Sequence, residues 1–243
     1  MQATWQSRQS LMEEWYRELV TRPDDAVAAM LYELRPHAAF LRGLQGRILD
    51  VGGGAGLASM FLPPEADLFI IDPSRIWMDE PWPGIRRRLA PERTEPGFTL
   101  GVGEELPFRD ASFDAVLCLW TFNHAADPAR CMDEIHRVLK PGGKVLLVLE
   151  DMEPSWPDIL RLALQEVNEA RGRPPRAPLY WHQENLETAK TGAIHKLLGR
   201  KWPLQDDHLP ISRRDLESWI DGKFRIVLRG WIGGFLSYEL SRS

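Results

Sequence analysis

The chain has 243 residues, of which 44 % are hydrophobic and 27 % charged, and its formal net charge is −5. This composition is typical of a globular domain, and an acidic balance without a basic stripe argues against nucleic acid as the main substrate. No run approaches the roughly 18 apolar residues of a membrane span, and charged residues stand where a signal peptide needs an apolar run. The two cysteines, Cys118 and Cys131, have neither metal-site nor disulfide-framework spacing, so we expect a cytoplasmic protein with reduced thiols.

The first 45 residues have apolar side chains at helical spacing, and we expect an N-terminal cap at Asp24 or Asp25. The chain then alternates between short apolar runs and helical patterns. Near-continuous apolar runs suit strands that are covered on both faces, and the alternation predicts a doubly wound, Rossmann-like α/β sheet. The five runs that we assign to strands are residues 47–51, 68–72, 98–102, 113–120 and 144–150.

The clearest helical pattern lies between the fourth and fifth runs. Asp127 stands at the cap position, Pro128 at the first helical position, and Gly142 at the expected stop.

The strand–helix alternation breaks after Glu150. Two amphipathic helices are expected at 157–171 and 182–198, separated by a Pro- and Arg-rich linker, and a cap at Ser212 with Asp215 precedes a last pair of strands. We expect one domain over residues 1–243, with a seven-stranded, mostly parallel sheet whose last strand is antiparallel. Its parts are N-terminal helices (1–45), a cofactor-binding core (46–150), a helical lid insertion (151–210), and a last helix and strand pair (211–243).

The glycine-rich turn after the first strand raises the question of its ligand. Asp50, Gly52, Gly54 and Gly56 give D-x-G-x-G-x-G, which matches neither the dinucleotide G-x-G-x-x-G spacing nor the lysine-containing P-loop. A carboxylate at the mouth of the turn repels a pyrophosphate and attracts an ammonium group. Asp72 ends the second strand, where a carboxylate can accept ribose hydroxyls. A ligand with an amino-acid end and a ribose, such as S-adenosylmethionine, fits both carboxylates.

Four segments in succession carry a family resemblance. They are ILDVGGGAG, IIDPS, GVGEELPFRDASFDAVLCLWTFNHAADP and HRVLKPGGKVLLV, and they span roughly residues 45–150. The chain resembles the class I S-adenosylmethionine-dependent methyltransferases, in the branch similar to the ubiquinone and menaquinone biosynthesis enzymes.

The resemblance implies cofactor contacts that we carry over residue by residue. One departure is Val102, which stands where the family often has an Asp that bonds the adenine amino group. The implied cofactor residues are Gly52, Gly53 and Gly54 at the methionine part, with Asp50 ordering their loop; Asp72 at the ribose; Pro73, Gly103 and Glu104 at the adenine; and Leu119 and Trp120 at the methionyl end.

Two histidines are candidates for assisting deprotonation of the acceptor. His124 follows the fourth strand, and a purely structural role is its alternative. His208 lies in the insertion beside Asp206 and Asp207, and a solvated loop position is its alternative. A metal site built from Asp206, Asp207 and His208 is disfavoured because adjacent residues rarely converge on one ion, so we predict no metal.

The sequence therefore predicts transfer of a methyl group from S-adenosylmethionine to a small, partly apolar molecule. The insertion and the N-terminal helices are expected to cover this acceptor. Core packing is expected for Trp15 and Tyr16, with closure of the cofactor pocket as the alternative role. A cyclase, decarboxylase or pericyclase that binds the same cofactor, and a non-catalytic binding module, stay open as alternatives. A dehydrogenase is disfavoured by the glycine spacing.

Overall fold

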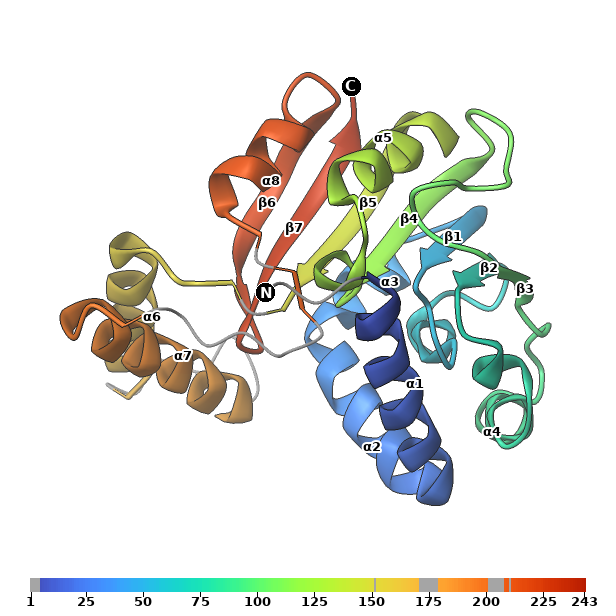
Figure 1. The fold of residues 1–243 in the computed structure, drawn as a ribbon, viewed down its shortest axis with the longest axis horizontal. Helices are drawn as coiled ribbons and strands as arrows, with labels where there is room; N and C mark the ends of the chain where they lie inside the picture. The colour runs from blue at the N-terminus through green and yellow to red at the C-terminus, as the bar shows by residue number, and fades with distance from the viewer. Residues whose placement is uncertain (1–4, 151, 171–178, 201–207, 210) are drawn as a thin grey trace.

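The computed structural model describes residues 5–150, 152–170, 179–200, 208–209 and 211–243, which form one sheet flanked by helices (Figure 1). The sheet of these residues has seven strands in the order β3-β2-β1-β4-β5-β7-β6. Strands β1 to β5 run parallel, and β7 is antiparallel to both of its neighbours, which confirms the predicted sheet. The strands are β1 (Arg47–Val51), β2 (Asp67–Asp72), β3 (Gly97–Leu100), β4 (Phe113–Leu119), β5 (Leu139–Leu149), β6 (Phe224–Ile232) and β7 (Phe235–Arg242).

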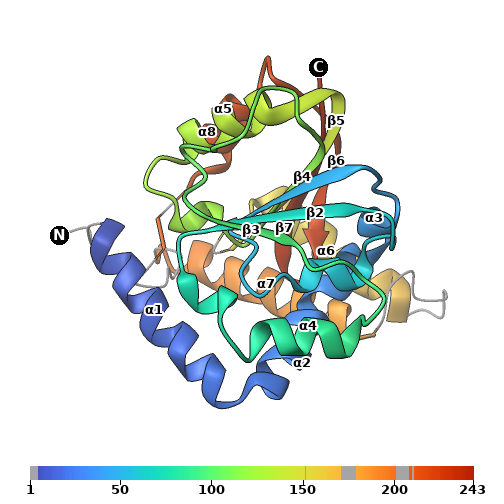
Figure 2. The same ribbon diagram turned by 90° about the vertical axis from the view of Figure 1, so that its right-hand side faces the viewer.

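Helices cover both faces of the sheet, as the near-continuous apolar strands require. Figure 2 shows α5 and α8 on one face and α1, α2 and α4 on the other, and a separate apolar core fills each interface. The α-helices are α1 (Trp5–Thr21), α2 (Pro23–Leu34), α3 (Ala38–Arg42), α4 (Trp82–Leu89), α5 (Pro128–Val138), α6 (Trp156–Ala170), α7 (Leu179–Leu197) and α8 (Arg213–Ile220). Short 3-10 turns are η1 (Arg35–His37), η2 (Leu57–Phe61), η3 (Arg75–Met78) and η4 (Phe122–His124).

The predicted start of the second N-terminal helix was wrong by two residues. Arg22 holds the N-cap position of α2 and Pro23 opens the helix, whose fixed φ suits that position. Asp24 and Asp25 lie in the first turn instead, where their charges favour the positive end of the helix dipole.

Helix α5 begins as predicted and ends earlier. The Asp127 carboxylate accepts a hydrogen bond from the Arg130 backbone N–H at 3.0 Å, which confirms the cap. The helix stops at Val138 rather than near Gly142, because the buried Leu139 already pairs with Phe113 of β4. Gly142 therefore lies within β5.

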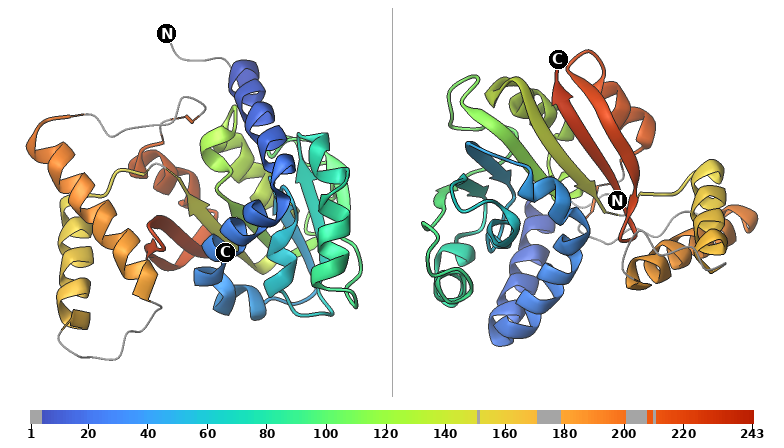
Figure 3. Two further views of the ribbon diagram at one scale, coloured as in Figure 1. Left: turned by 90° about the horizontal axis from the view of Figure 1, so that it is seen from below. Right: turned by 180° about the vertical axis from the view of Figure 1, so that it is seen from behind.

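The insertion forms a pair of helices, α6 and α7, that packs beside the end of the sheet near β6 (Figures 1 and 3). Their bounds match the predicted helices within three residues, and the linker between them lies outside the described residues. Ile159, Leu162 and Ala189 form a small core that extends to Trp231 of β6.

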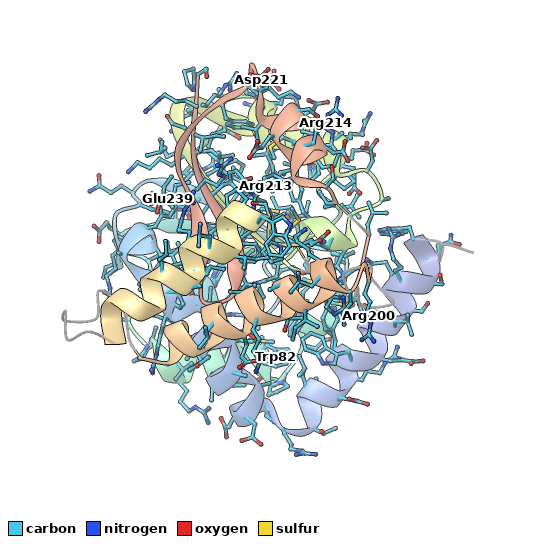
Figure 4. The ribbon with its side chains drawn as sticks, turned by 90° about the vertical axis from the view of Figure 1, so that its left-hand side faces the viewer. Trp82, Arg200, Arg213, Arg214, Asp221 and Glu239 are labelled. Carbon is cyan, nitrogen blue, oxygen red and sulfur yellow. The ribbon has the colours of Figure 1, made fainter. Side chains whose placement is uncertain are left out.

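A salt bridge joins the insertion to the rest of the domain. The Asp158 carboxylate, at the start of α6, lies 2.5 Å from the Arg213 guanidinium of α8. Arg213 is labelled in Figure 4. The Ser212 hydroxyl accepts a bond from the Asp215 N–H, as the predicted cap requires. None of the described helices is long and apolar enough to cross a membrane.

Candidate functional site

A cavity of about 210 Å³ lies at the carboxyl ends of β1, β2 and β4. The strand order reverses between β1 and β4, and such switch points are where open α/β sheets bind ligands. Helices α1 and α2 contribute the opposite wall through Met12, Tyr16 and Met30. Nine of the residues proposed from the sequence line this cavity: Asp50, Gly52, Gly53, Gly54, Asp72, Pro73, Leu119, Trp120 and His124.

The turn after β1 presents bare backbone to the cavity. Gly52 has a φ of +68°, and a Cβ on it would lie 2.4 Å from the Thr121 side chain. A Cβ on Gly53 would lie 2.7 Å from the Asp50 carboxylate. Only glycine permits both approaches, so the loop can bring peptide groups close to a ligand.

Asp50 has a buried carboxyl group with one oxygen that lacks a hydrogen-bond partner among the described residues. The residue is 2 % exposed, and the oxygen without a partner is Oδ1. Burial, and then the charge of Asp72, raises the pKa of Asp50 to about 8. An unpaired carboxylate facing a cavity favours a cationic donor such as an ammonium group.

Asp72 is held in place by the backbone. Its Oδ1 accepts from the Ser74 N–H at 2.9 Å, and its Oδ2 accepts from the Gly54 N–H at 3.1 Å. Burial raises the pKa of Asp72 to about 6, although these two bonds favour the charged form. Each oxygen keeps a lone pair for a further donor, so the pair of oxygens can accept two hydroxyl groups.

Aromatic rings form one side of the cavity. The rings of Tyr16 on α1 and Trp77 on η3 meet edge to face, with centroids 4.6 Å apart. Trp15, for which core packing was expected, is 49 % exposed and lines the cavity together with Tyr16. Planar apolar surfaces of this kind suit a flat heterocycle such as adenine.

Gly103 and Glu104 lie outside the set of residues that line the cavity. The Glu104 carboxylate accepts from the backbone N–H groups of Ala126 and Asp127, at 2.6 and 3.1 Å. Gly103 packs against Cys131, whose sulfur would be 2.4 Å from an added Cβ. Both residues therefore fix the loop after β3 to the start of α5, and their adenine contacts stay a prediction.

The two candidate histidines converge on a glutamate that the sequence analysis did not single out. The Glu150 Oε2 lies 3.3 Å from the His124 Nε2 and 3.2 Å from the His208 Nε2. Burial alone would raise the pKa of Glu150, but the two histidines outweigh it and hold that pKa below its usual value. We call these three residues the histidine–glutamate cluster.

Only part of this cluster faces the cavity. His124 and Glu150 line it, whereas the His208 side chain is 2 % exposed and lies behind them. Asp206 and Asp207, considered with His208 above, lie outside the described residues.

Glu150 and Trp77 are the main cavity residues that sequence reasoning missed. Glu150 directly follows β5, and the rule that identified Asp50 and Asp72 at the carboxyl ends of their strands applies to it equally. Trp77 lies on a short turn with no local signal of its position.

Known proteins resemble the chain most clearly in its cofactor-binding core. A model of the methyltransferase domain family matches residues 49–147. An uncharacterized methyltransferase of Mycobacterium tuberculosis is 37 % identical over 103 residues, which cover 42 % of this chain and 39 % of that protein. A demethylmenaquinone methyltransferase of Symbiobacterium thermophilum is 30 % identical over 158 residues, 58 % of this chain and 50 % of that protein. The matched regions thus span half or less of the length of these relatives.

Two solved structures share the fold over nearly the whole chain. A 1,6-didemethyltoxoflavin-N1-methyltransferase of Burkholderia thailandensis, with 1,6-didemethyltoxoflavin and S-adenosylhomocysteine bound, has a TM-score of 0.61 and 15 % identity, and covers 100 % of this chain and 92 % of that one. An S-adenosylmethionine-dependent methyltransferase of Aquifex aeolicus has a TM-score of 0.53 and 17 % identity, with coverage of 87 % and 92 %. At these identities the likeness concerns the fold.

Proposed function

We propose that this chain, which belongs to the class I S-adenosylmethionine-dependent methyltransferases, transfers a methyl group to a small, partly apolar acceptor. The observation that carries the proposal is the pair of buried carboxylates, Asp50 and Asp72, at adjacent strand ends in one cavity. Their placement suits a ligand with an ammonium group at one end and a ribose beside it.

S-adenosylmethionine supplies a methyl group on a positively charged sulfur, so the protein needs mainly to position the acceptor and exclude water. Asp50 would accept the ammonium group, and Asp72 the ribose hydroxyls. The bare backbone at Gly52 and Gly53 would approach the methionine part, and Tyr16 and Trp77 would flank the heterocycle. The unpaired Oδ1 of Asp50 favours this ligand over a phosphate, which a carboxylate would repel.

The acceptor would occupy the side of the cavity that lies toward β4 and β5. Met12, Leu119 and Trp120 provide apolar surface there, and His124 and Glu150 provide a polar end. We propose that the histidine–glutamate cluster assists the loss of a proton from the acceptor. The apolar surroundings favour a small organic molecule over a charged polymer.

We propose that α1 and α2 are the main elements that cover the bound cofactor and acceptor. Among the described residues these helices line the cavity, and α6 and α7 do not. The insertion acts on the site through His208, which it brings to Glu150.

The first experiment is calorimetric titration with S-adenosylmethionine and S-adenosylhomocysteine. We expect both to bind the wild type, and Asp50→Ala and Asp72→Asn to weaken binding by about tenfold or more, as for loss of a buried polar partner. Asp67→Asn is the matched control, because Asp67 is the exposed first residue of β2, the strand that Asp72 ends. No binding to the wild type at millimolar ligand would reject the proposal.

A second measurement separates methyl transfer from other chemistry on the same cofactor. Formation of S-adenosylhomocysteine with a panel of small hydroxylated, thiol and amine acceptors is the expected result. Cofactor binding with product formed but no S-adenosylhomocysteine would instead indicate a non-methylating enzyme.

A further inference from the structure

The histidine–glutamate cluster is assembled from three separate segments. His124 ends η4, which follows β4, and Glu150 directly follows β5, so parallel pairing of β4 and β5 brings both residues to the same edge. His208 lies near the end of the insertion, after α7. The nitrogen and oxygen atoms that the three residues offer all lie within 4.8 Å of one another.

Backbone and amide hydrogen bonds hold the two histidines in this arrangement. The Leu209 N–H donates to the Asn123 carbonyl at 2.6 Å, and the Asn123 side-chain amide donates to the Leu209 carbonyl at 3.2 Å. Asn123 is fully buried. Because each residue of this clamp is the sequence neighbour of a histidine, the clamp fixes His208 against His124.

The spacing of the three groups suits an ion between them. Ligand atoms about 2.1 Å from a metal lie about 3.0–3.5 Å apart at octahedral or tetrahedral angles. The two nitrogen–oxygen distances, 3.3 and 3.2 Å, fall in this range. They are longer than the 2.7–2.9 Å that is typical of a charge-assisted hydrogen bond. The two imidazole rings lie close together, with centroids 4.5 Å apart and an interplanar angle of 81°.

We propose that His124, Glu150 and His208 bind one divalent transition-metal ion, of the zinc or iron(II) kind, at the acceptor end of the cavity. Two imidazoles and one carboxylate are a donor set that such ions prefer, and three protein ligands leave coordination positions open. Because His124 and Glu150 line the cavity, the open positions face the acceptor.

The role of the ion rests on the proposed function, whereas its binding does not. A hydroxyl group held beside a divalent cation loses its proton more readily. The O–H bond breaks and its proton passes to water. The oxygen lone pair then forms the bond to the methyl carbon, and the pair of the broken carbon–sulfur bond stays on sulfur, which becomes a neutral thioether. No oxidant or reductant is needed.

Cobalt(II) titration of chelator-treated protein tests the site directly, because Co²⁺ bound by nitrogen and oxygen ligands absorbs visible light. We expect one ion per chain with a dissociation constant below about 100 µM, and displacement by Zn²⁺. Glu150→Gln and His208→Asn, which keep side-chain size or polarity, should each weaken binding by more than tenfold. His136→Gln is the control, since His136 lies on α5 against Phe224 and away from the cluster.

Three results would overturn the inference. One is the absence of a Co²⁺ spectrum in the wild type, which needs no variant to fold. Another is a spectrum that persists in both Glu150→Gln and His208→Asn. The third is equal weakening in His136→Gln. Calorimetry with S-adenosylmethionine on the same metal-free protein keeps the two proposals apart, because the cofactor should bind there with undiminished affinity. Metal binding without cofactor binding would reject the proposed function alone.

Discussion

Replacing Asp50 by asparagine should stabilise the ligand-free protein, and increasingly so as the pH rises. The folded protein raises the pKa of this carboxyl from 3.8 to about 8 through burial and the charge of Asp72. An acid whose pKa is raised by folding opposes folding wherever the unfolded chain has ionised. The penalty is therefore absent below about pH 4 and grows until the pH reaches about 8.

The size of the effect follows from proton linkage. Between the two pKa values the folded protein keeps a proton that the unfolded chain has lost, so the free energy of unfolding falls by about 1.4 kcal/mol per pH unit. From about pH 5 to about pH 7, Asp50 alone should remove about 3 kcal/mol from the wild type. Asparagine has nearly the same shape and no charge, so the variant should not show this loss.

Urea unfolding at a series of pH values measures the difference. The quantity to compare is the slope of unfolding free energy against pH in wild type, Asp50→Asn and the exposed control Asp67→Asn. We expect the control to follow the wild type and Asp50→Asn to have the shallower decline. Equal slopes for Asp50→Asn and wild type would mean that the carboxyl already ionises in the folded protein at ordinary pH, which would refute the burial penalty.

Three further changes test other parts of the structure. Gly52→Ala should cost about 1–2 kcal/mol of stability, because of the positive φ and the close contact with Thr121, and should abolish cofactor binding. The control Gly222→Ala, at a similar φ of +72° with nothing within 4 Å, should affect stability only. Equal cofactor affinities of the two variants would contradict the close approach of the Gly52 backbone to the cofactor. Tyr16→Ala should weaken S-adenosylmethionine binding about three- to tenfold by calorimetry, because it removes one of the two rings that form the aromatic wall of the cavity with Trp77. Wild-type affinity in this variant would exclude α1 from the cofactor site. Arg213→Ala should lower the free energy of unfolding by about 1–3 kcal/mol, because it leaves the buried Asp158 carboxylate with fewer partners; a double-mutant cycle with Asp158→Asn that gives no coupling energy would refute this.

The sheet could be predicted because its strands are apolar on both faces and differ in period from the helices between them. The cap at Asp127 could also be predicted, because a carboxylate directly before a helix-opening proline accepts a hydrogen bond from a backbone N–H of the first turn. The two errors, at Asp24 and Gly142, concern the ends of helices, where several residues within one turn could each start or stop the helix. At Gly142 the deciding factor was pairing of Leu139 with a strand far away in sequence.

The site likewise contains residues that local sequence patterns reveal and residues that only contacts distant in sequence bring into place. Asp50, Asp72 and His124 follow strands that the sequence reveals, and carboxyl ends of parallel strands meet at one edge. Glu150 also lies at the carboxyl end of its strand, but its role in the site depends on contacts with His124 and His208. The bonds between Leu209 and Asn123 help to hold His208 at Glu150, and no local sequence pattern encodes them.

The contact between Glu150 and His208 also has a consequence for how this family could diversify. The insertion begins directly after Glu150 and has His208 near its end, so its two ends meet at the contact between these residues. Closing a longer or shorter insertion costs little extra entropy, because that cost grows only with the logarithm of its length. Such an insertion can change in length while its two ends stay joined at Glu150 and His208.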